Sequence, residues 1–353
     1  MKLVFLNDTH CGVRNSSDIF IKYQEAFYND VFFPYLLEND IKHIVHLGDY
    51  YEHRRFINFK ALSSNRQVFL DKLREYGITM DIVPGNHDTY YKNTIQLNAL
   101  KELMGHYINE VTIHMDPTVL DFDGLKLGLV PWICSENEQQ IDEFLRNCKA
   151  DMIGGHFEIA GFELLRGIIC KEGMDKAPLE RFERVFSGHY HIKSRQDNIE
   201  YFGAQMEFFW NDAGEDKFFH ILDTETREVT AVQNPIKLFE KIYYDDENQD
   251  YNEYSTDHLD DKFVKIVVVN KTDPFTFDRF VDRVQSRKIY EMKIQEDFSE
   301  FLGENVSDEG IEIEDTTELL RGYVDNIETV LDKERLKKEL IGLMKESESL
   351  EIA

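Results

Sequence analysis

The first 240 residues alternate short apolar runs with longer amphipathic segments. The runs at 2–6, 42–47 and 79–84 (KLVFL, KHIVHL and TMDIVP) have the length and residue types of buried strands. Between them, segments 18–39 and 58–77 carry apolar residues three or four positions apart, and this spacing predicts helices. Strands and helices that alternate in this way predict an α/β fold, with a mostly parallel sheet covered by helices.

The pattern continues into a second half with more strand-like runs. The Asp-Gly pair in DFDGLKLG predicts a hairpin, so we expect this half to be more antiparallel than the first. The runs are VTIHM, TVLDFDGLKLGLVPW, ADMIGG, RVFSG and IEYFG.

Beyond residue 235 the organisation changes. An acidic, tyrosine-rich connector leads to KFVKIVVVN, PFTFDRFVDRVQS and KIYEMKIQ, which predict a strand, a helix and a strand, a small βαβ unit. A second acidic stretch predicts a linker, and helical spacing returns after it. We therefore predict a core at 1–235, a capping domain at 236–300, a linker at 301–314 and a C-terminal helical segment at 315–353.

Composition narrows the class of protein. A hydrophobic fraction of 42%, with 13% aromatic residues, can fill sizeable cores and excludes wholesale disorder. No apolar run approaches the roughly 20 residues of a membrane helix, and the first ten residues predict a strand rather than a signal peptide. The four cysteines lie far apart without CxxC spacing, so we expect a reducing, cytoplasmic location.

The net charge of −28, from 40 Lys and Arg against 68 Asp and Glu, taken alone argues against a nucleic-acid partner. Bound metal ions bring local positive charge that residue counting misses, so the number does not exclude one.

Five short polar signatures each follow an apolar run. If those runs are strands, the signatures lie at strand carboxyl ends, where α/β sheets bind their ligands. Singly, each fits a turn or cap, and satisfied histidines at polar strand ends are the alternative interpretation of the whole set. The signatures are Asp8-Thr9-His10, Gly48-Asp49, Gly85-Asn86-His87-Asp88, His156, and His189-Tyr190-His191.

The residue types indicate which ions such a site would hold. Two Asp, one Asn and four His without cysteine suit manganese, iron or zinc better than calcium. Seven ligands exceed the needs of one ion and suit two ions that share a carboxylate. Two ions about 3.5–4 Å apart can bind the attacking and the leaving oxygen of a phosphoryl displacement.

In this order and spacing, the signatures resemble the calcineurin-like metallophosphoesterase superfamily. PW at 131–132, GGHF, and SGHYH followed by YFGA resemble one branch, the Mre/SbcD-type nucleases of double-strand-break repair. PWICSENE and GHFEIAGFEL resemble the phage recombination endonuclease subunits of that branch. The match covers the first 230 residues by motif and the rest by architecture. It implies a two-sheet sandwich flanked by helices, a smaller α+β capping domain and C-terminal helices.

The resemblance also implies a role for each matching residue. His87 would face the scissile phosphate and stabilise charge or protonate the leaving oxygen, and Asp88 would support this catalytic residue. The ions would most readily be Mn²⁺, with Mg²⁺ as the alternative. One ion would be held by Asp8, His10, Asp49 and His191, and the other by Asp49, Asn86, His156 and His189.

One position departs from the pattern. Related nucleases often carry a histidine three residues after the shared Asp, and here that position is Glu52, followed by His53. Which of the two replaces that histidine stays open. A basic cluster nearby is a candidate DNA contact or an ordinary solvated face: Arg54, Arg55, Lys60 and Arg66.

The resemblance implies partners as well. The helix at 18–39 is rich in aromatic residues on more than one face. It would form a homodimer together with a helix at 94–104, and internal packing is the alternative. The C-terminal helices would dock on an SbcC-like ABC/SMC-type ATPase, or pack on the capping domain instead.

The implied function is a metal-dependent DNA nuclease with 3′–5′ exonuclease and endonuclease activity, acting on DNA ends in recombination and repair. In the implied step, metal-bound hydroxide attacks the phosphodiester. The alternatives are a phosphomonoesterase, a cyclic-nucleotide phosphodiesterase and a non-catalytic scaffold of the same fold.

Overall fold

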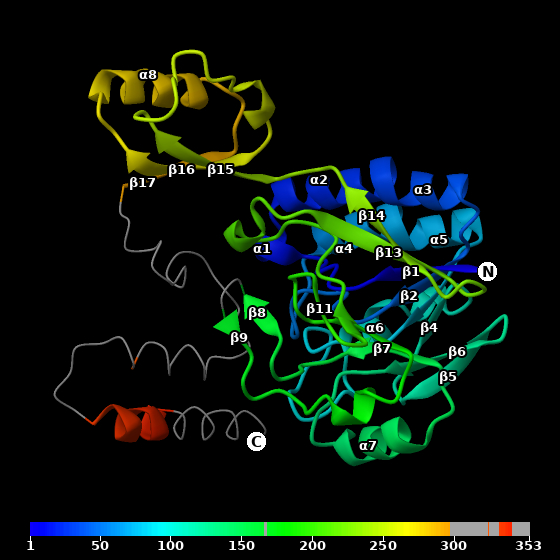
Figure 1. Cartoon of the computed structure of the whole chain (residues 1–353). Helices are drawn as coiled ribbons and strands as arrows, with labels where there is room; N and C mark the ends of the chain where they lie inside the picture. Colours follow the sequence, from blue (N-terminus) through cyan, green and yellow to red (C-terminus); the bar gives the residue numbers. More distant parts are fainter. Residues whose placement is uncertain (166–167, 297–323, 325–331, 341–353) are drawn as a thin grey trace. The chain divides into compact units, whose positions relative to one another are not determined.

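The structure is a computed structural model that describes residues 1–165, 168–296, 324 and 332–340 (Figure 1). The chain divides into two compact units, Met1–Asp297 and Phe298–Ala353. In the second unit, residues 324 and 333–340 are helical. The predicted linker, and most of the predicted C-terminal segment, lie outside the described residues.

The first large sheet carries the amino-terminal strands. Its order is β14-β13-β1-β2-β3-β4, and β1 to β4 run parallel, as the alternating pattern predicts. The last two strands add antiparallel pairs on the far side of β1. The strands are β1 (Lys2–Leu6), β2 (His43–His46), β3 (Thr79–Ile82), β4 (Val111–Ile113), β13 (Lys217–Asp223) and β14 (Val229–Asn234).

The second large sheet has the order β11-β12-β10-β7-β6-β5. The predicted hairpin is confirmed, since β5 and β6 pair antiparallel around the Asp-Gly turn. The expectation of a more antiparallel half is wrong for the centre of this sheet, where four strands run parallel and only the edges are antiparallel. The strands are β5 (Thr118–Phe122), β6 (Leu125–Val130), β7 (Met152–His156), β10 (Arg184–Gly188), β11 (Ser194–Gln196) and β12 (Ile199–Tyr201).

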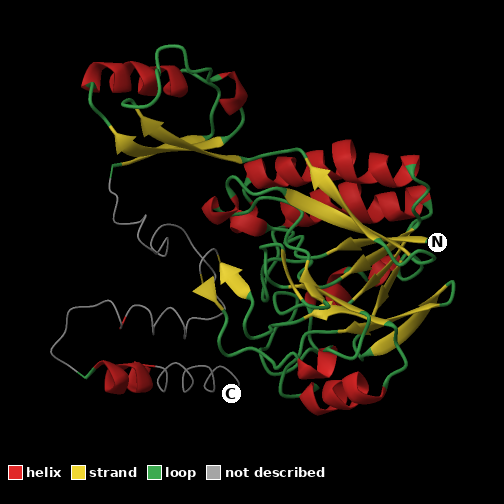
Figure 2. Ribbon diagram, viewed as in Figure 1, coloured by secondary structure: helices red, strands yellow, loops and turns green. Residues whose placement is uncertain are grey.

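The two large sheets pack face to face, so the predicted α/β sandwich is confirmed. Leu3, Phe5 and Val45 of the first sheet share one buried cluster with Leu127 and Phe186 of the second. Figure 2 shows the strands gathered in the middle of this unit with helices on its outside. The helices are α2 (Asp18–Ala26), α3 (Phe33–Glu38), α4 (Phe59–Asn65), α5 (Asp71–Tyr76), α6 (Ala99–Leu103) and α7 (Glu138–Asn147).

Two short connections complete this unit. The turn α1 (Val13–Ser16) follows β1, and the small hairpin of β8 (Glu163–Leu165) and β9 (Ile168–Ile169) follows β7. The helix expected at 94–104 is shorter than predicted. It begins only after Asn98, because the side chain of Asn98 accepts a hydrogen bond from the Lys101 amide and caps α6.

The aromatic helix over residues 18–38 is covered within the chain. Its π-helical turn Phe27–Phe32 joins α2 to α3, and most of its aromatic side chains are buried. Phe69, from the helical run α4–α5, packs against Tyr28 and Phe32. Internal packing, the alternative in the sequence, therefore accounts for the aromatic excess of this helix.

Residues 236–296, the described part of the predicted capping domain, form a three-stranded parallel sheet with one α-helix. The predicted strand, helix and strand are β16 (Phe263–Asn270), α8 (Pro274–Gln285) and β17 (Glu291–Gln295). A further strand, β15 (Phe239–Asp245), pairs in parallel with β16 and was not predicted. The sequence analysis missed β15 because its last residues, YYD, are also the first residues of the acidic stretch that was interpreted as a connector.

No helix among the described residues is long and apolar enough to cross a membrane.

Candidate metal centre

The structure brings all seven predicted ligands to one place. They lie at or just after the carboxyl ends of five strands, three from the first sheet and two from the second. Asp8 and His10 follow β1, Asp49 follows β2, Asn86 follows β3, His156 ends β7, and His189 and His191 follow β10.

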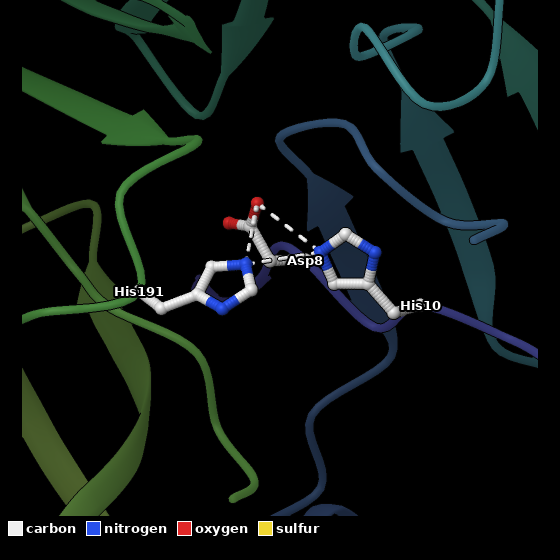
Figure 3. Close-up of side chains that lie close together, drawn as sticks. All are labelled: Asp8, His10 and His191. Atoms are coloured by element: carbon white, nitrogen blue, oxygen red, sulfur yellow. Dashed lines mark hydrogen bonds and ion pairs between the residues drawn. The ribbon is translucent and has the colours of Figure 1, made fainter. Parts of the chain in front are cut away.

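Asp8, His10 and His191 form the first cluster (Figure 3). The Nε2 atoms of His10 and His191 lie 3.0 Å apart. Each also lies close to Asp8 Oδ1, at 3.9 Å for His10 and 3.8 Å for His191. Three ligand atoms from two sheets thus converge on one point.

Asp49, His156 and His189 form the second cluster. His156 Nε2 lies 3.1 Å from Asp49 Oδ2 and 2.7 Å from Asn86 Oδ1. Asn86 Oδ1 also lies 3.1 Å from His189 Nδ1. The amide oxygen of Asn86 therefore faces the same point as the two imidazoles.

Asp49 connects the two clusters. Its carboxylate belongs to the second cluster and also to a group with His10 and His87. His10 is shared with the first cluster, so Asp49 lies where a bridging carboxylate would lie.

The donor set fits divalent metal ions. Asp8 and Asp49 are at most 2% exposed, and a charged carboxylate that is buried is stabilised by cations or hydrogen-bond donors beside it. His10 and His191 direct two ring nitrogens at each other, an arrangement that a cation between them would stabilise. Imidazole, carboxylate and amide oxygen without thiolate suit Mn²⁺, Fe²⁺ or Zn²⁺.

Asp49 and His156 shift each other's pKa toward the charged forms, whereas burial raises the pKa of Asp8 and lowers that of His191. Burial alone would raise the pKa of Asp49, but His156 and His87 outweigh it and hold that pKa well below its ordinary value. Burial alone would lower the pKa of His156, yet Asp49 raises it to about 9. A buried carboxylate that favours its charged form this strongly attracts positive charge.

Four of the seven ligands have strained backbone. Left-handed φ is uncommon outside glycine and costs on the order of 1–3 kcal/mol per residue. Such strain concentrates at functional sites, because the surrounding structure must impose it. The φ angles are 47° at Asp8, 44° at His10, 55° at Asp49 and 85° at His189.

Two glycines let these loops approach one another. A Cβ at Gly85 would lie 2.1 Å from Asp49 Oδ1, and one at Gly48 would lie 2.6 Å from His156 Nδ1. Gly48 also has a φ of 96°. Any side chain at either position would displace a ligand of the second cluster.

The two predicted catalytic residues differ in what they contact. His87 is half-buried, and its Nδ1 donates to the backbone carbonyl of Glu52 at 2.7 Å. Asp88 is fully buried and accepts hydrogen bonds from the amides of Tyr50, Tyr51 and Gly85. Its oxygens therefore hold the loops after β2 and β3 together.

Aromatic side chains flank both clusters, and the sequence did not single them out for this. The ring of Trp132 lies 5.3 Å from that of His189 and 5.9 Å from that of His156. On the other side, Phe208 packs 5.6 Å from His10, and Phe209 stacks 6.0 Å from His191. The sequence indicated their place beside the ligands only through the motifs PW and EFFW, and such motifs are also found in a hydrophobic core or at the edge of a site.

The predicted DNA contacts have partners within the chain. Lys60 pairs with Asp18, and Arg66 donates to the carbonyl of Leu103 at 3.4 Å. The Arg55 guanidinium lies 5.7 Å from the centre of the Tyr90 ring. Contact of these residues and Arg54 with DNA stays a prediction.

Comparisons with known proteins agree with this geometry. Residues 1–193 match the calcineurin-like phosphoesterase family, a range that includes all seven ligands. The chain is 27% identical over 337 residues to exonuclease subunit 1 of Enterobacteria phage T4, which covers 95% of each protein. A solved archaeal phosphodiesterase aligns over 66% of this chain and 100% of its own at 16% identity. Its TM-score of 0.33 is too low to support an argument.

Proposed function

The chain belongs to the calcineurin-like phosphoesterase family of metal-dependent hydrolases, and we propose that its substrate is DNA. The similarity to a phage exonuclease subunit carries this proposal, because it runs over 95% of both chains and so includes the capping domain. The proposed activities are 3′–5′ exonuclease and endonuclease action on DNA ends in recombination and double-strand-break repair.

The seven ligands would hold two divalent ions, which we propose to be Mn²⁺, with Mg²⁺ as the alternative. When bound, such a pair activates water and neutralises charge on the phosphate. Asp49 would be shared between the ions, which its place between the two clusters supports. One ion would be held by Asp8, His10, Asp49 and His191, and the other by Asp49, Asn86, His156 and His189.

His87 would act on the phosphate directly. The Glu52 carbonyl accepts a hydrogen bond from its Nδ1, which fixes the orientation of the ring. Its half-buried position allows contact with the phosphate. There it would stabilise charge on the phosphate or donate a proton to the leaving oxygen. Asp88 would position this loop through the three amides that it binds.

A row of lysines on the capping sheet supports a polyanionic substrate. Lys241 of β15, Lys265 of β16 and Lys293 of β17 are register partners, so three cations lie side by side. Lys293 also pairs with Glu291 at 4.0 Å, and side-by-side cations are a feature that phosphates of a nucleic acid can follow. Lys265 Nζ lies 4.7 Å from the Trp210 ring, next in sequence to Phe209 of the metal centre. We propose that a DNA strand follows this row.

A homodimer would use a different surface from the aromatic helix. Phe59 is 85% exposed, Ile108 76% and Phe56 64%. Phe59 also lines a groove of about 290 Å³, together with Leu62, Arg66 and Tyr107. Exposed apolar surface of this kind is typical of protein interfaces. We propose this face, near α4 and α6, as the dimer contact, and sedimentation of the full chain tests it.

An ABC/SMC-type ATPase stays the proposed second partner. The T4 relative is by its name a subunit, which supports a complex. Sharing the DNA with another protein would also fit the net charge of −28, since one acidic chain need not supply all phosphate contacts. Action in the cytoplasm of a host cell is part of the same proposal.

The test compares substrates at one Mn²⁺ concentration. We expect the full chain to degrade end-labelled duplex DNA, to hydrolyse p-nitrophenyl phosphate far more slowly, and to lose both activities with chelator. If the chain hydrolyses the monoester or a cyclic nucleotide faster than DNA, it is a phosphomonoesterase or a cyclic-nucleotide phosphodiesterase and not a nuclease. A chain that binds no Mn²⁺ would be a scaffold.

A further inference from the structure

We propose that Glu52 is a positioning residue of the metal centre, which orients His10 through its side chain and His87 through its backbone. The inference rests on the proposed ligation of an ion by His10. The sequence left open whether Glu52 or His53 takes the place of the histidine found in related nucleases, and this inference assigns that place to Glu52.

The side chain of Glu52 holds His10 from behind. Glu52 Oε2 lies 2.7 Å from His10 Nδ1, and Glu52 is only 7% exposed. The contact is an ion pair rather than a hydrogen bond, and the charge of the carboxylate favours the proton on Nδ1, which leaves the lone pair on Nε2. That nitrogen is the one that lies 3.0 Å from His191 Nε2, in the first cluster.

The carboxylate of Glu52 and the imidazole of His10 are both buried, so water does not separate the two side chains. A carboxylate behind a ligating imidazole makes the imidazole a more basic ligand and fixes its ring orientation.

The backbone of Glu52 holds His87. Its carbonyl accepts from His87 Nδ1 at 2.7 Å, and its amide donates to the Cys11 carbonyl at 3.1 Å. Cys11 in turn donates to Tyr50 at 2.8 Å. One residue thus ties the loops after β1, β2 and β3, which carry His10, Asp49 and His87.

His53 adjoins Glu52 but belongs to none of the converging ligand groups among the described residues. Its ring stacks on Phe56 at 4.4 Å between centroids, and Phe56 is 64% exposed. Glu52 is also not a ligand itself in this arrangement, because its carboxylate lies on the Nδ1 side of His10, whereas the converging ligand atoms lie on the Nε2 side. The geometry therefore assigns the supporting role to Glu52.

The experiment titrates Mn²⁺ into the metal-free full chain by calorimetry, for the wild type, Glu52→Gln, Glu52→Asp and His53→Ala. Loss of an outer partner typically costs about 10–100-fold in metal affinity. We expect Glu52→Gln to weaken one of two Mn²⁺ sites by that factor and to leave the other unchanged. Glu52→Asp, which keeps the charge, should recover part of the loss, and His53→Ala should match the wild type.

DNA cleavage supplies a second readout. In Glu52→Gln we expect kcat to fall at low Mn²⁺ and to recover substantially at high Mn²⁺, with KM for DNA unchanged. A merely structural defect would not be restored by metal. Wild-type Mn²⁺ affinity in both Glu52 variants, or a loss confined to His53→Ala, would overturn the assignment. A wild type that binds no Mn²⁺ would overturn the metal centre and this inference with it.

Discussion

Asn86, His87 and Asp88 are adjacent in sequence yet serve three different contacts. Asn86 Oδ1 faces His156 and His189, His87 Nδ1 binds the Glu52 carbonyl, and Asp88 binds backbone amides. Burial raises the pKa of Asp88 to about 6, and the neighbouring Asp49 adds to the shift. The three residues were identifiable from sequence because they follow a strand. Their separate directions were not, because these depend on loops that meet only in the fold.

At the same scale, removing the His87 imidazole should separate binding from chemistry. His87→Ser keeps every proposed ligand, so Mn²⁺ affinity should stay within a few-fold of the wild type. Cleavage of DNA should fall by about 10²–10⁴-fold, the usual contribution of a general acid. Calorimetry and single-turnover cleavage on the same preparation check both values.

The interpretation of His87 would be wrong if Mn²⁺ binding fell in parallel with cleavage. In that case His87 would be a ligand, as its grouping with His10 and Asp49 also allows.

Single residues also show what sequence patterns miss. Glu52 reads as an exception to the family motif, and nothing in its spacing indicates that its carboxylate reaches His10. Trp132, Phe208 and Phe209 likewise lie beside ligands that are distant in sequence. Contacts between loops of different strands depend on side-chain direction, which periodicity does not encode.

Among the elements, three neighbouring strands are linked by a buried carboxylate. Asp81 of β3 accepts from His43 of β2 at 2.6 Å and from His114, just after β4, at 2.5 Å. From sequence these histidines had no partner spacing, because partners across parallel strands are separated by whole helices. The Asp81 carboxylate therefore connects β2, β3 and β4 at one edge of the first sheet.

This link should be visible as a pH-dependent part of the stability. Burial alone would raise the pKa of Asp81, but hydrogen bonds from His114 and His43 outweigh it and lower that pKa from 3.8 to about 2. The stabilisation is therefore complete above pH 3.8 and is lost as the pH falls through 2. Asp81→Asn should cost on the order of 1–2 kcal/mol near neutral pH, allowing for solvent screening.

Urea unfolding of the wild type and Asp81→Asn at pH 7 and at pH 3 measures that difference. The gap between the two proteins should be smaller at pH 3. An equal gap at both values would show that the carboxylate charge does not contribute, and that the variant acts only through packing.

Elements were most predictable where one pattern was strong. The parallel strands of the first sheet and the β5–β6 hairpin follow their apolar runs and turn residues. The strand β15 was missed because its tyrosines continue into acidic residues, and α6 was drawn too long because the Asn98 cap was not recognised. In both cases the surrounding residue composition led to the wrong prediction, although a local feature, the apolar run of β15 or the Asn98 cap of α6, pointed to the correct one.

At the scale of the whole molecule, the segment from Glu207 to Trp210 contacts the start of β15, the first strand of the predicted capping domain. Glu207 is fully buried and accepts from the amides of Leu238 and Phe239, where β15 begins. The Trp210 ring packs 5.0 Å from Phe239. Phe208 and Phe209 of the same segment contact His10 and His191, so this segment links the start of β15 to the candidate metal centre.

Whole-molecule properties were the hardest to predict from sequence. The charge of −28 argues against DNA, and only the buried ligand set and the lysine row of the capping sheet offset that argument. The aromatic helix was a candidate interface, but its rings are covered by the chain itself. An exposed face depends on what tertiary packing leaves uncovered, which no local pattern records.

The central claim is that this metal centre hydrolyses DNA. Its most direct test is the rate of degradation of end-labelled duplex DNA in Mn²⁺ by the wild type and by Asp49→Asn, side by side. Two ions supply several kcal/mol of transition-state stabilisation, so the variant should be slower by roughly a thousand-fold or more. Degradation by Asp49→Asn at the wild-type rate, or wild-type degradation that persists in chelator, would contradict the account.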